Sequence, residues 1–180
     1  MLPVAEWQKT GETNDKQISS EDLAREPGVN STIYYGIHIF ADDKNQNLIT
    51  KALELMNEKT PEFFKLVYDN VKEIRQSKSH FSMGPVRSVP GMDRIEFRNF
   101  SGEYSAYNVA DFLVHEATHI IDQKRGLSYT KEAEIRAREA EIAFFLALEK
   151  VEGRSFKDMI RFVDNEINMI KKGHLYGELP

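Results

Sequence analysis

The feature that most restricts how this chain can fold is an apolar run with two histidines and a glutamate inside it. Residues 111–122, with the sequence DFLVHEATHIID, contain the pattern His-Glu-x-x-His. Residues four apart lie on one face of a helix, so His115 and His119 can present two imidazole nitrogens to one ion. Buried ionisable groups are costly unless they are paired or bind a metal. The run therefore predicts a buried helix that carries two metal ligands.

Glu116 lies one step round this helix, beside such an ion rather than on it. A carboxylate in that place can take a proton from water activated by the metal. Two imidazoles, one carboxylate and an open position for water form a common catalytic zinc site. We therefore expect one Zn²⁺ bound by His115, His119 and a carboxylate from elsewhere in the chain. The alternative interpretation is a buried helix with two hydrogen-bonded histidines and a salt-bridged glutamate.

Composition limits the classes of partner and compartment. The chain of 180 residues is long enough for one domain with a hydrophobic core, and its net charge of −5 argues against a nucleic-acid or anionic-membrane surface. It has no cysteine, so thiolate ligands and a cysteine nucleophile are excluded. No apolar run reaches the length of a membrane span, and the first residues lack the pattern of a signal peptide. We expect a soluble protein, either cytoplasmic or a secreted mature domain without its leader.

The element pattern predicts an α+β fold. Residues 1–30 are polar and predict a flexible arm that is dispensable for folding, followed by a single domain over residues 31–180. The predicted elements are a strand over 31–40, helices over 48–59 and 61–77, a hairpin of 86–89 with 93–100, the motif helix to Arg125, a helix from Thr130 to about Val151, and a last helix over 155–172. Alternation in the strand over 93–100 indicates half-exposure, which would let an extended substrate pair with it.

The helix from Thr130 combines an apolar stripe with charged residues. We expect Ile135, Ile142 and Leu146 to form this stripe, with Phe145 and Leu148 widening it. Its acidic residues favour a solvated, salt-bridged face for at least three of the four. They are Glu132, Glu134, Glu139 and Glu141.

The motif and this next helix together resemble a known group. The pattern His115-Glu-x-x-His119-x-x-Asp122, followed by a helical Glu-x-x-Ala, is similar to the zinc metallopeptidases called gluzincins. Residues 130–137 resemble the glutamate-bearing helix of the anthrax lethal factor-like branch, and the whole resemblance covers residues 111–150. It implies a zincin-like fold with a small mixed or antiparallel sheet, several long helices, and an active-site helix followed by a glutamate helix.

The resemblance also implies roles for individual residues. His115, His119 and Glu134 would be zinc ligands, Glu116 the general base, and Asp122 the hydrogen-bond partner of a ligating histidine. A tyrosine precedes the glutamate helix in the lethal factor-like branch, which implies Tyr129 as the oxyanion donor, although here it lies closer to the glutamate. His174 and Tyr176 are alternative donors.

The third ligand is open to a second interpretation. Helix geometry admits any carboxylate from Glu134 to Glu139, and Glu139 has the spacing from the second histidine found in thermolysin. Ala137, three residues after Glu134, leaves room for close approach of two helices, whereas Ile142 occupies that place relative to Glu139. We therefore prefer Glu134.

Three functions are compatible with these residues. The first is a metallopeptidase acting on a peptide or protein substrate. The second is a zinc-dependent amidase or maturation hydrolase, and the third is a binding module with a metal site that does no chemistry. The intact Glu116 disfavours the third, because a structural metal site has no need of that carboxylate. No nucleic-acid or membrane partner is expected.

Overall fold

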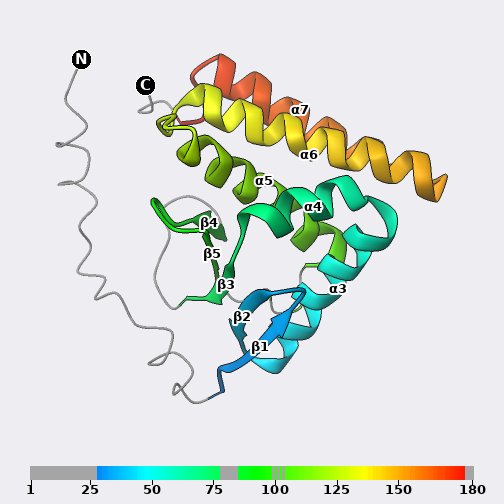
Figure 1. The fold of residues 1–180 in the computed structure, drawn as a ribbon. Helices are drawn as coiled ribbons and strands as arrows, with labels where there is room; N and C mark the ends of the chain where they lie inside the picture. The colour runs from blue at the N-terminus through cyan, green and yellow to red at the C-terminus, as the bar shows by residue number, and fades with distance from the viewer. Residues whose placement is uncertain (1–27, 78–84, 99, 101, 103, 177–180) are drawn as a thin grey trace.

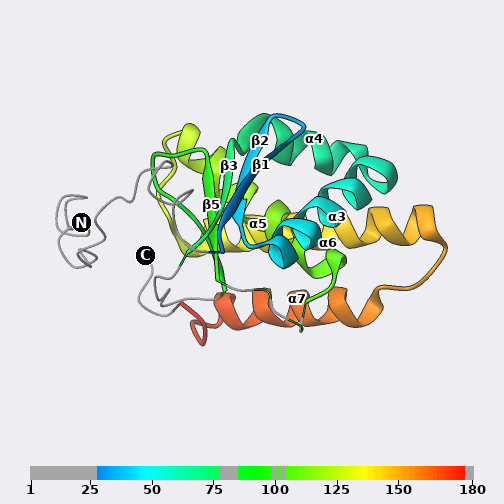
Figure 2. The same cartoon turned by 90° about the horizontal axis from the view of Figure 1, so that it is seen from below.

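The computed structural model describes residues 28–77, 85–98, 100, 102 and 104–176. The described residues form an α+β fold with five helices and one five-stranded sheet, as expected (Figure 1). Nearly all of the predicted arm of residues 1–30 lies outside the described residues. In the view from below, α3 and α4 lie beside the strands and α7 runs along the bottom of the picture (Figure 2).

The sheet is mixed. It contains β1 (Asn30–Tyr34), β2 (Ile37–Ala41), β3 (Glu73–Gln76), β4 (Val86–Ser88) and β5 (Arg94–Phe97). The strand order is β1-β2-β3-β5-β4. The central pairs β2–β3 and β3–β5 are parallel, and the outer pairs β1–β2 and β4–β5 are antiparallel.

The predicted strand over 31–40 is in fact a hairpin. Tyr35 and Gly36 both have positive φ, 48° and 80°, in the two-residue turn between β1 and β2. Positive φ at both central residues is the geometry whose twist suits a tight hairpin. Periodicity alone did not reveal this turn, because the aromatic residues on both sides of Gly36 continue the strand-like composition.

The predicted helix over 61–77 is correct only in its first part. Helix α3 (Asp43–Lys59) starts earlier than expected, because Asp42 caps it, and α4 (Pro61–Asn70) follows. The chain then becomes extended at Val71 and forms β3. Val71 and Ile74 do face the core, as helical spacing predicted, but from a loop and a central strand. The tertiary pairing of β3 on both sides overrides the local pattern.

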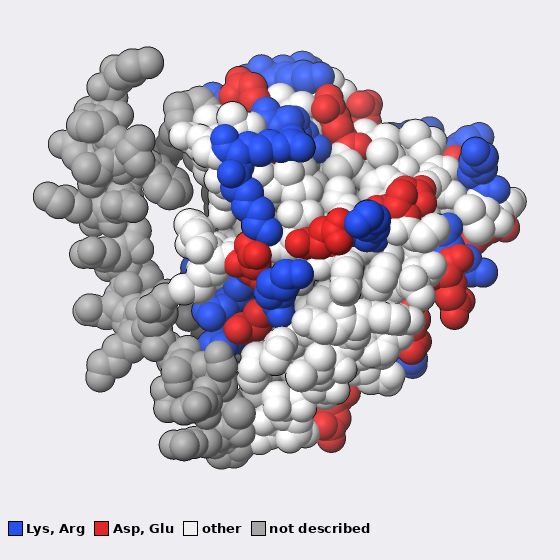
Figure 3. All heavy atoms as spheres, in the orientation of Figure 1, with Lys and Arg blue, Asp and Glu red and all other residues white. Residues whose placement is uncertain are grey.

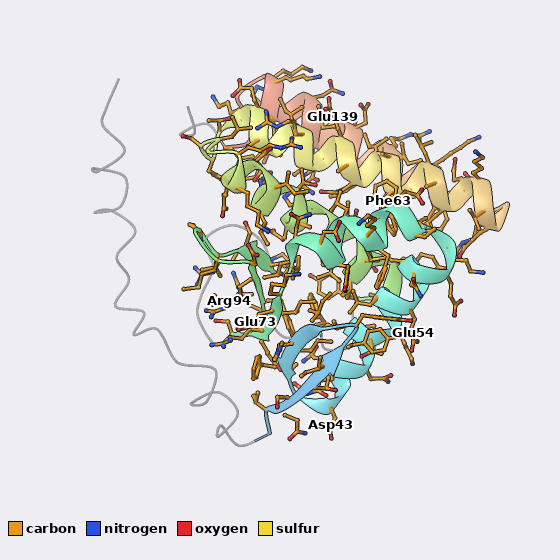
Figure 4. All side chains as sticks on the ribbon, viewed as in Figure 1. Asp43, Glu54, Phe63, Glu73, Arg94 and Glu139 are labelled. Atoms are coloured by element: carbon orange, nitrogen blue, oxygen red, sulfur yellow. The ribbon has the colours of Figure 1, made fainter. Side chains whose placement is uncertain are left out.

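The half-exposure predicted for the strand over 93–100 is confirmed, because Ile95 and Phe97 of β5 are buried while the residues that alternate with them are half-buried. The expectation that a substrate could pair with this strand is wrong. β5 is hydrogen-bonded to β3 on one side and to β4 on the other, so no substrate can pair with it. Its outward side chains are held by ion pairs, with Arg94 Nε 2.8 Å from Glu73 on β3 and Arg87 on β4 2.7 Å from Glu96. Figure 3 shows basic and acidic groups alternating over this face, and Figure 4 labels Arg94 beside Glu73. In the described part of the sheet, β4 is the edge beside β5.

Three helices complete the fold. They are α5 (Ala106–Lys124), α6 (Lys131–Glu152) and α7 (Lys157–Lys171). Helix α5 contacts α3, α4, β4 and β5 on one side and α6 on another, while α7 packs on α6. The core lies between the sheet and α3, α4 and α5, and includes Ile39, Leu53, Met56, Val67, Ile74, Ile95, Phe97, Leu113, Val114, Phe144 and Phe145. None of the helices in the described ranges is long and apolar enough to cross a membrane.

The apolar stripe predicted for α6 is only partly correct, because Phe145 and Leu148 are buried but the other three residues are not. Ile135 and Ile142 are only half-buried and Leu146 is 50% exposed. The buried positions instead combine small, acidic and aromatic side chains, namely Ala133, Glu134, Ala137, Glu141, Phe144, Phe145 and Leu148. The face of α6 that contacts α5 is therefore defined by polar partners and small residues as much as by hydrophobicity.

Candidate metal centre

Helix α5 places three ionisable groups in one row. The helix begins with a capping box in which the Ser105 hydroxyl accepts the Asn108 N–H and the Asn108 side chain accepts the Ser105 N–H. From that fixed start, Asp111, His115 and His119 follow at intervals of four residues, and all three are buried. The predicted helix and its burial are confirmed.

The short connection between α5 and α6 brings the chain back towards His115 and His119. Gly126 has a φ of 72°, a left-handed conformation that ends α5 at low steric cost. Thr130 then caps α6 by accepting the Ala133 N–H, as expected from its sequence. Glu134 consequently lies in the first turn of α6, directly against the histidines of α5.

The structure brings His115, His119 and Glu134 together. Each contributes one potential ligand atom, and these atoms lie within 4.8 Å of one another. The two histidine Nε2 atoms are 3.0 Å apart, and the Glu134 oxygens lie 3.3 Å from His119 Nε2 and 3.7 Å from His115 Nε2. Ligands bound at 2.0–2.1 Å in a tetrahedral site are about 3.3 Å apart. The spacing therefore fits one small cation.

The hydrogen bonding of the group also fits a cation. Glu134 Oε2 is buried without a hydrogen-bond partner among the described residues. Buried carboxylate oxygens are normally satisfied, and the cost of an unsatisfied one falls when a metal ion takes the place of the donor. Two imidazoles and a carboxylate are, in addition, ligands that zinc accepts. The group can therefore hold a metal ion.

The electrostatics of the group depend on its mutual contacts. Burial opposes the charged form of Glu134, but the hydrogen bond with His119 and the charges of the two histidines outweigh it and lower the pKa of Glu134 to about 2. Burial likewise opposes the charged form of His115, yet the hydrogen bond and charge of Glu141 raise the pKa of His115 to about 9. Glu134 is thus an anion at neutral pH, as a ligand must be.

Glu116 points to the edge of the sheet. Its Oε2 accepts a hydrogen bond of 2.5 Å from the backbone N–H of Ser88 on β4. The side chain is buried, so this hydrogen bond ties the carboxylate to the strand next to α5. Glu116 is not one of the residues whose ligand atoms lie within 4.8 Å of one another, although its charge acts on His115. The position beside the cluster, predicted from the helix, agrees with this geometry.

Of the three candidate oxyanion donors, Tyr129 is nearest to the cluster. Its hydroxyl donates to a Glu134 oxygen, and its ring centroid lies 5.0 Å from that of His119. Burial and the negative charge of Glu134 raise the pKa of Tyr129, so its hydroxyl stays protonated and able to donate. Burial and the charge of Glu134 raise the pKa of Tyr176, which also hydrogen-bonds Arg138, and His174 is exposed.

The structure separates two further predicted residues, Glu139 and Asp122, from the cluster. Glu139, the alternative third ligand, is exposed on α6 and outside the cluster, whereas Glu134 is 1% exposed within it (Figure 4). Asp122 was expected to hold a histidine ring, but its carboxylate instead accepts two hydrogen bonds, of 3.0 and 2.8 Å, from Arg136. The part of α5 beyond His119 thus joins α6 through an ion pair rather than through the cluster.

Sequence reasoning missed the residues behind the histidines. Glu141 contacts His115 Nδ1 and is 2% exposed, although it was expected with the solvated glutamates. Asp111 is buried four residues before His115, and its burial and the charge of Glu141 raise its pKa well above the usual value. The signal was spacing: Glu141 lies seven residues after Glu134, and therefore on the same face of α6.

Comparison with known families finds no family model that matches this chain, and no curated protein matches it significantly.

Proposed function

We propose that this chain is a zinc-dependent peptidase. The observation that carries the proposal is the buried cluster of His115, His119 and Glu134, with ligand atoms within 4.8 Å, next to a carboxylate that is not part of it. The chemistry of the three ligands favours zinc, and one coordination position would stay open. A site with only a structural role has no use for the adjacent Glu116.

Each residue beside the cluster then has a defined role. Bound zinc would polarise the scissile carbonyl and lower the pKa of water to ~7. Glu116 would accept a proton from the attacking water and pass it to the leaving amine. Tyr129 turns its hydroxyl from Glu134 to the developing oxyanion and donates a hydrogen bond to it. The raised pKa of Tyr129 keeps that proton available at neutral pH.

The substrate would be held along β4 rather than β5. Within the described sheet β4 is the edge, and the Ser88 N–H is directed to Glu116, away from β5. An extended peptide can add to such an edge through main-chain hydrogen bonds. This arrangement would place a scissile bond beside both Glu116 and the cluster.

The test uses the zinc-reconstituted protein with a peptide mixture, and cleavage is detected by mass spectrometry. We expect new termini with the wild type and a loss of turnover of ~10²–10⁴-fold in Glu116→Gln, because general-base catalysis has that magnitude. The variant should keep one zinc per chain, which metal analysis would measure. Cleavage of small amides but not of peptides would favour an amidase. Absence of zinc from the reconstituted wild type would refute the proposal.

A further inference from the structure

A chain of buried polar contacts leads from His115 to the C-terminal helix. The His115 Nδ1 atom contacts a Glu141 oxygen on α6. Glu141 accepts hydrogen bonds of 2.9 and 3.2 Å from Arg138 Nη1, one turn earlier on the same helix. Arg138 Nη1 in turn lies 3.1 Å from Glu166 Oε2 on α7. Three helices are thus connected behind the cluster.

The position of Glu141 has a physical consequence for the histidine. A neutral imidazole that uses Nε2 as a ligand carries its proton on Nδ1, and an acceptor at Nδ1 fixes both the tautomer and the ring orientation. Glu141 is that acceptor for His115. The two histidines differ in this respect, because His119 Nδ1 is buried without a hydrogen-bond partner among the described residues.

Arg138 and Glu166 offset the energetic cost of burying the Glu141 carboxylate. Glu141 is 2% exposed, and its charge adds to burial in raising the pKa of Asp111. A buried carboxylate needs a paired cation, and Arg138 is the cation that reaches it. Glu166 is half-buried and supplies a second negative charge, which balances Arg138 and holds its guanidinium from the α7 side.

We propose that Glu141 is a positioning residue for the metal ligand His115, and that α7 is part of the metal site through Glu166 and Arg138. The proposal rests on the function proposed above, since it requires that His115 binds a metal. It goes beyond that function by assigning the last helix, which carries none of the cluster residues, a role in metal affinity.

The first test is zinc affinity, measured by competition with a chromophoric chelator. Glu141→Ala should weaken binding by about 10–100-fold, the range for loss of a partner that orients a ligand. Glu141→Gln keeps an acceptor of nearly the same shape, so it should weaken binding less. Glu139→Gln is the matched control, because it removes one negative charge from the same helix at an exposed position.

The second test is the tautomer of His115, which a merely structural role would not change. In the wild type we expect a proton on Nδ1 that is visible by ¹⁵N NMR and protected from exchange with solvent. Glu141→Ala should remove the protection, and Glu141→Gln should restore it in part. If Glu141→Ala does not fold, zinc affinity and protection of the Nδ1 proton are both measured on Glu141→Gln instead.

The proposed role of α7 is tested separately with a variant of Glu166. Glu166→Gln should weaken zinc binding by more than Glu139→Gln and by less than Glu141→Ala, because Arg138 retains its hydrogen bonds to Glu141. Equal affinities of Glu166→Gln and Glu139→Gln would overturn the role of α7. Equal affinities of Glu141→Ala and wild type, together with an unchanged Nδ1 signal, would overturn the role of Glu141. Failure of the wild type to bind zinc would instead refute the proposed function.

Discussion

Two sides of α5 are both buried, but they carry different kinds of side chain. The side against the sheet, α3 and α4 is apolar apart from Glu116, which is hydrogen-bonded to β4. It places Val109, Leu113, Ala117 and Ile120 in the core. The side against α6 carries Asp111, His115, His119 and Asp122, which are equally buried. Burial of the apolar side stabilises the folded state. Burial of the ionisable side destabilises it unless each group has a hydrogen-bonding or charged partner.

The comparison shows how one helix can separate stability from chemistry. The contacts of α5 with the sheet, α3 and α4 need no metal, and its contacts with α6 include the ion pair between Asp122 and Arg136 outside the cluster. The ionisable side is then free to keep a carboxylate and two imidazoles 3.0–3.7 Å apart, an arrangement that a core alone would not favour. Substitutions on the apolar side should therefore change the free energy of unfolding, and substitutions on the ionisable side should change metal affinity.

The largest expected effect is on the ionisable side. Glu134→Ala removes one of three proposed ligands, so we expect zinc affinity to fall by more than the ~10–100-fold seen for residues that only orient a ligand. Glu139→Ala, on the exposed face of the same helix, should stay within a few-fold of wild type. Competition titration measures both. The reverse result would move the ligand to Glu139 and leave the role of Glu116 unchanged.

On the apolar side, Leu113→Ala should lower the free energy of unfolding by about 2–5 kcal/mol, because it leaves a cavity in a tightly packed core. Zinc affinity of the folded variant should stay within a few-fold of wild type. Leu146→Ala is the control, since Leu146 is 50% exposed and should change stability by no more than about 0.5 kcal/mol. Urea denaturation with a chelator present measures stability. A strong loss of zinc affinity in Leu113→Ala would mean that the two sides are not separable.

The smallest effect concerns pH. The folded-state pKa of His115, about 9, lies above its ordinary value of 6.5. Protonated His115 therefore stabilises the metal-free protein fully below pH 6.5, and this contribution is lost as the pH rises through 9. Bound zinc requires the neutral imidazole, so stabilisation by zinc should grow over the same range.

Thermal melts of chelator-treated and zinc-loaded protein between pH 6.5 and 9 would show the opposite trends. Chelator-treated Glu141→Gln is the control, because it lacks the charge that keeps the His115 pKa high, and its melting temperature should depend less on pH. Equal pH dependence in Glu141→Gln and wild type would mean that the ion pair with Glu141 does not control His115.

The sequence determined the parts of this protein that depend on local spacing. His115, Glu116 and His119 are placed by the periodicity of one helix, and the stop at Gly126 and the cap at Thr130 follow from the conformations these residue types favour. The short connection admitted both Glu134 and Glu139 as the third ligand, and Ala137, which leaves room for close approach of the two helices, favoured Glu134.

Only the tertiary structure decided the rest. The four residues of β3 became a strand because they pair on both sides, and β5 became a central strand for the same reason. Arg138 and Glu166 look like surface charges in the sequence, and Glu141 differs from Glu139 only in its spacing of seven residues from Glu134. Their partners lie on different helices, and the burial of a charge is set by what packs against it rather than by its neighbours in the chain.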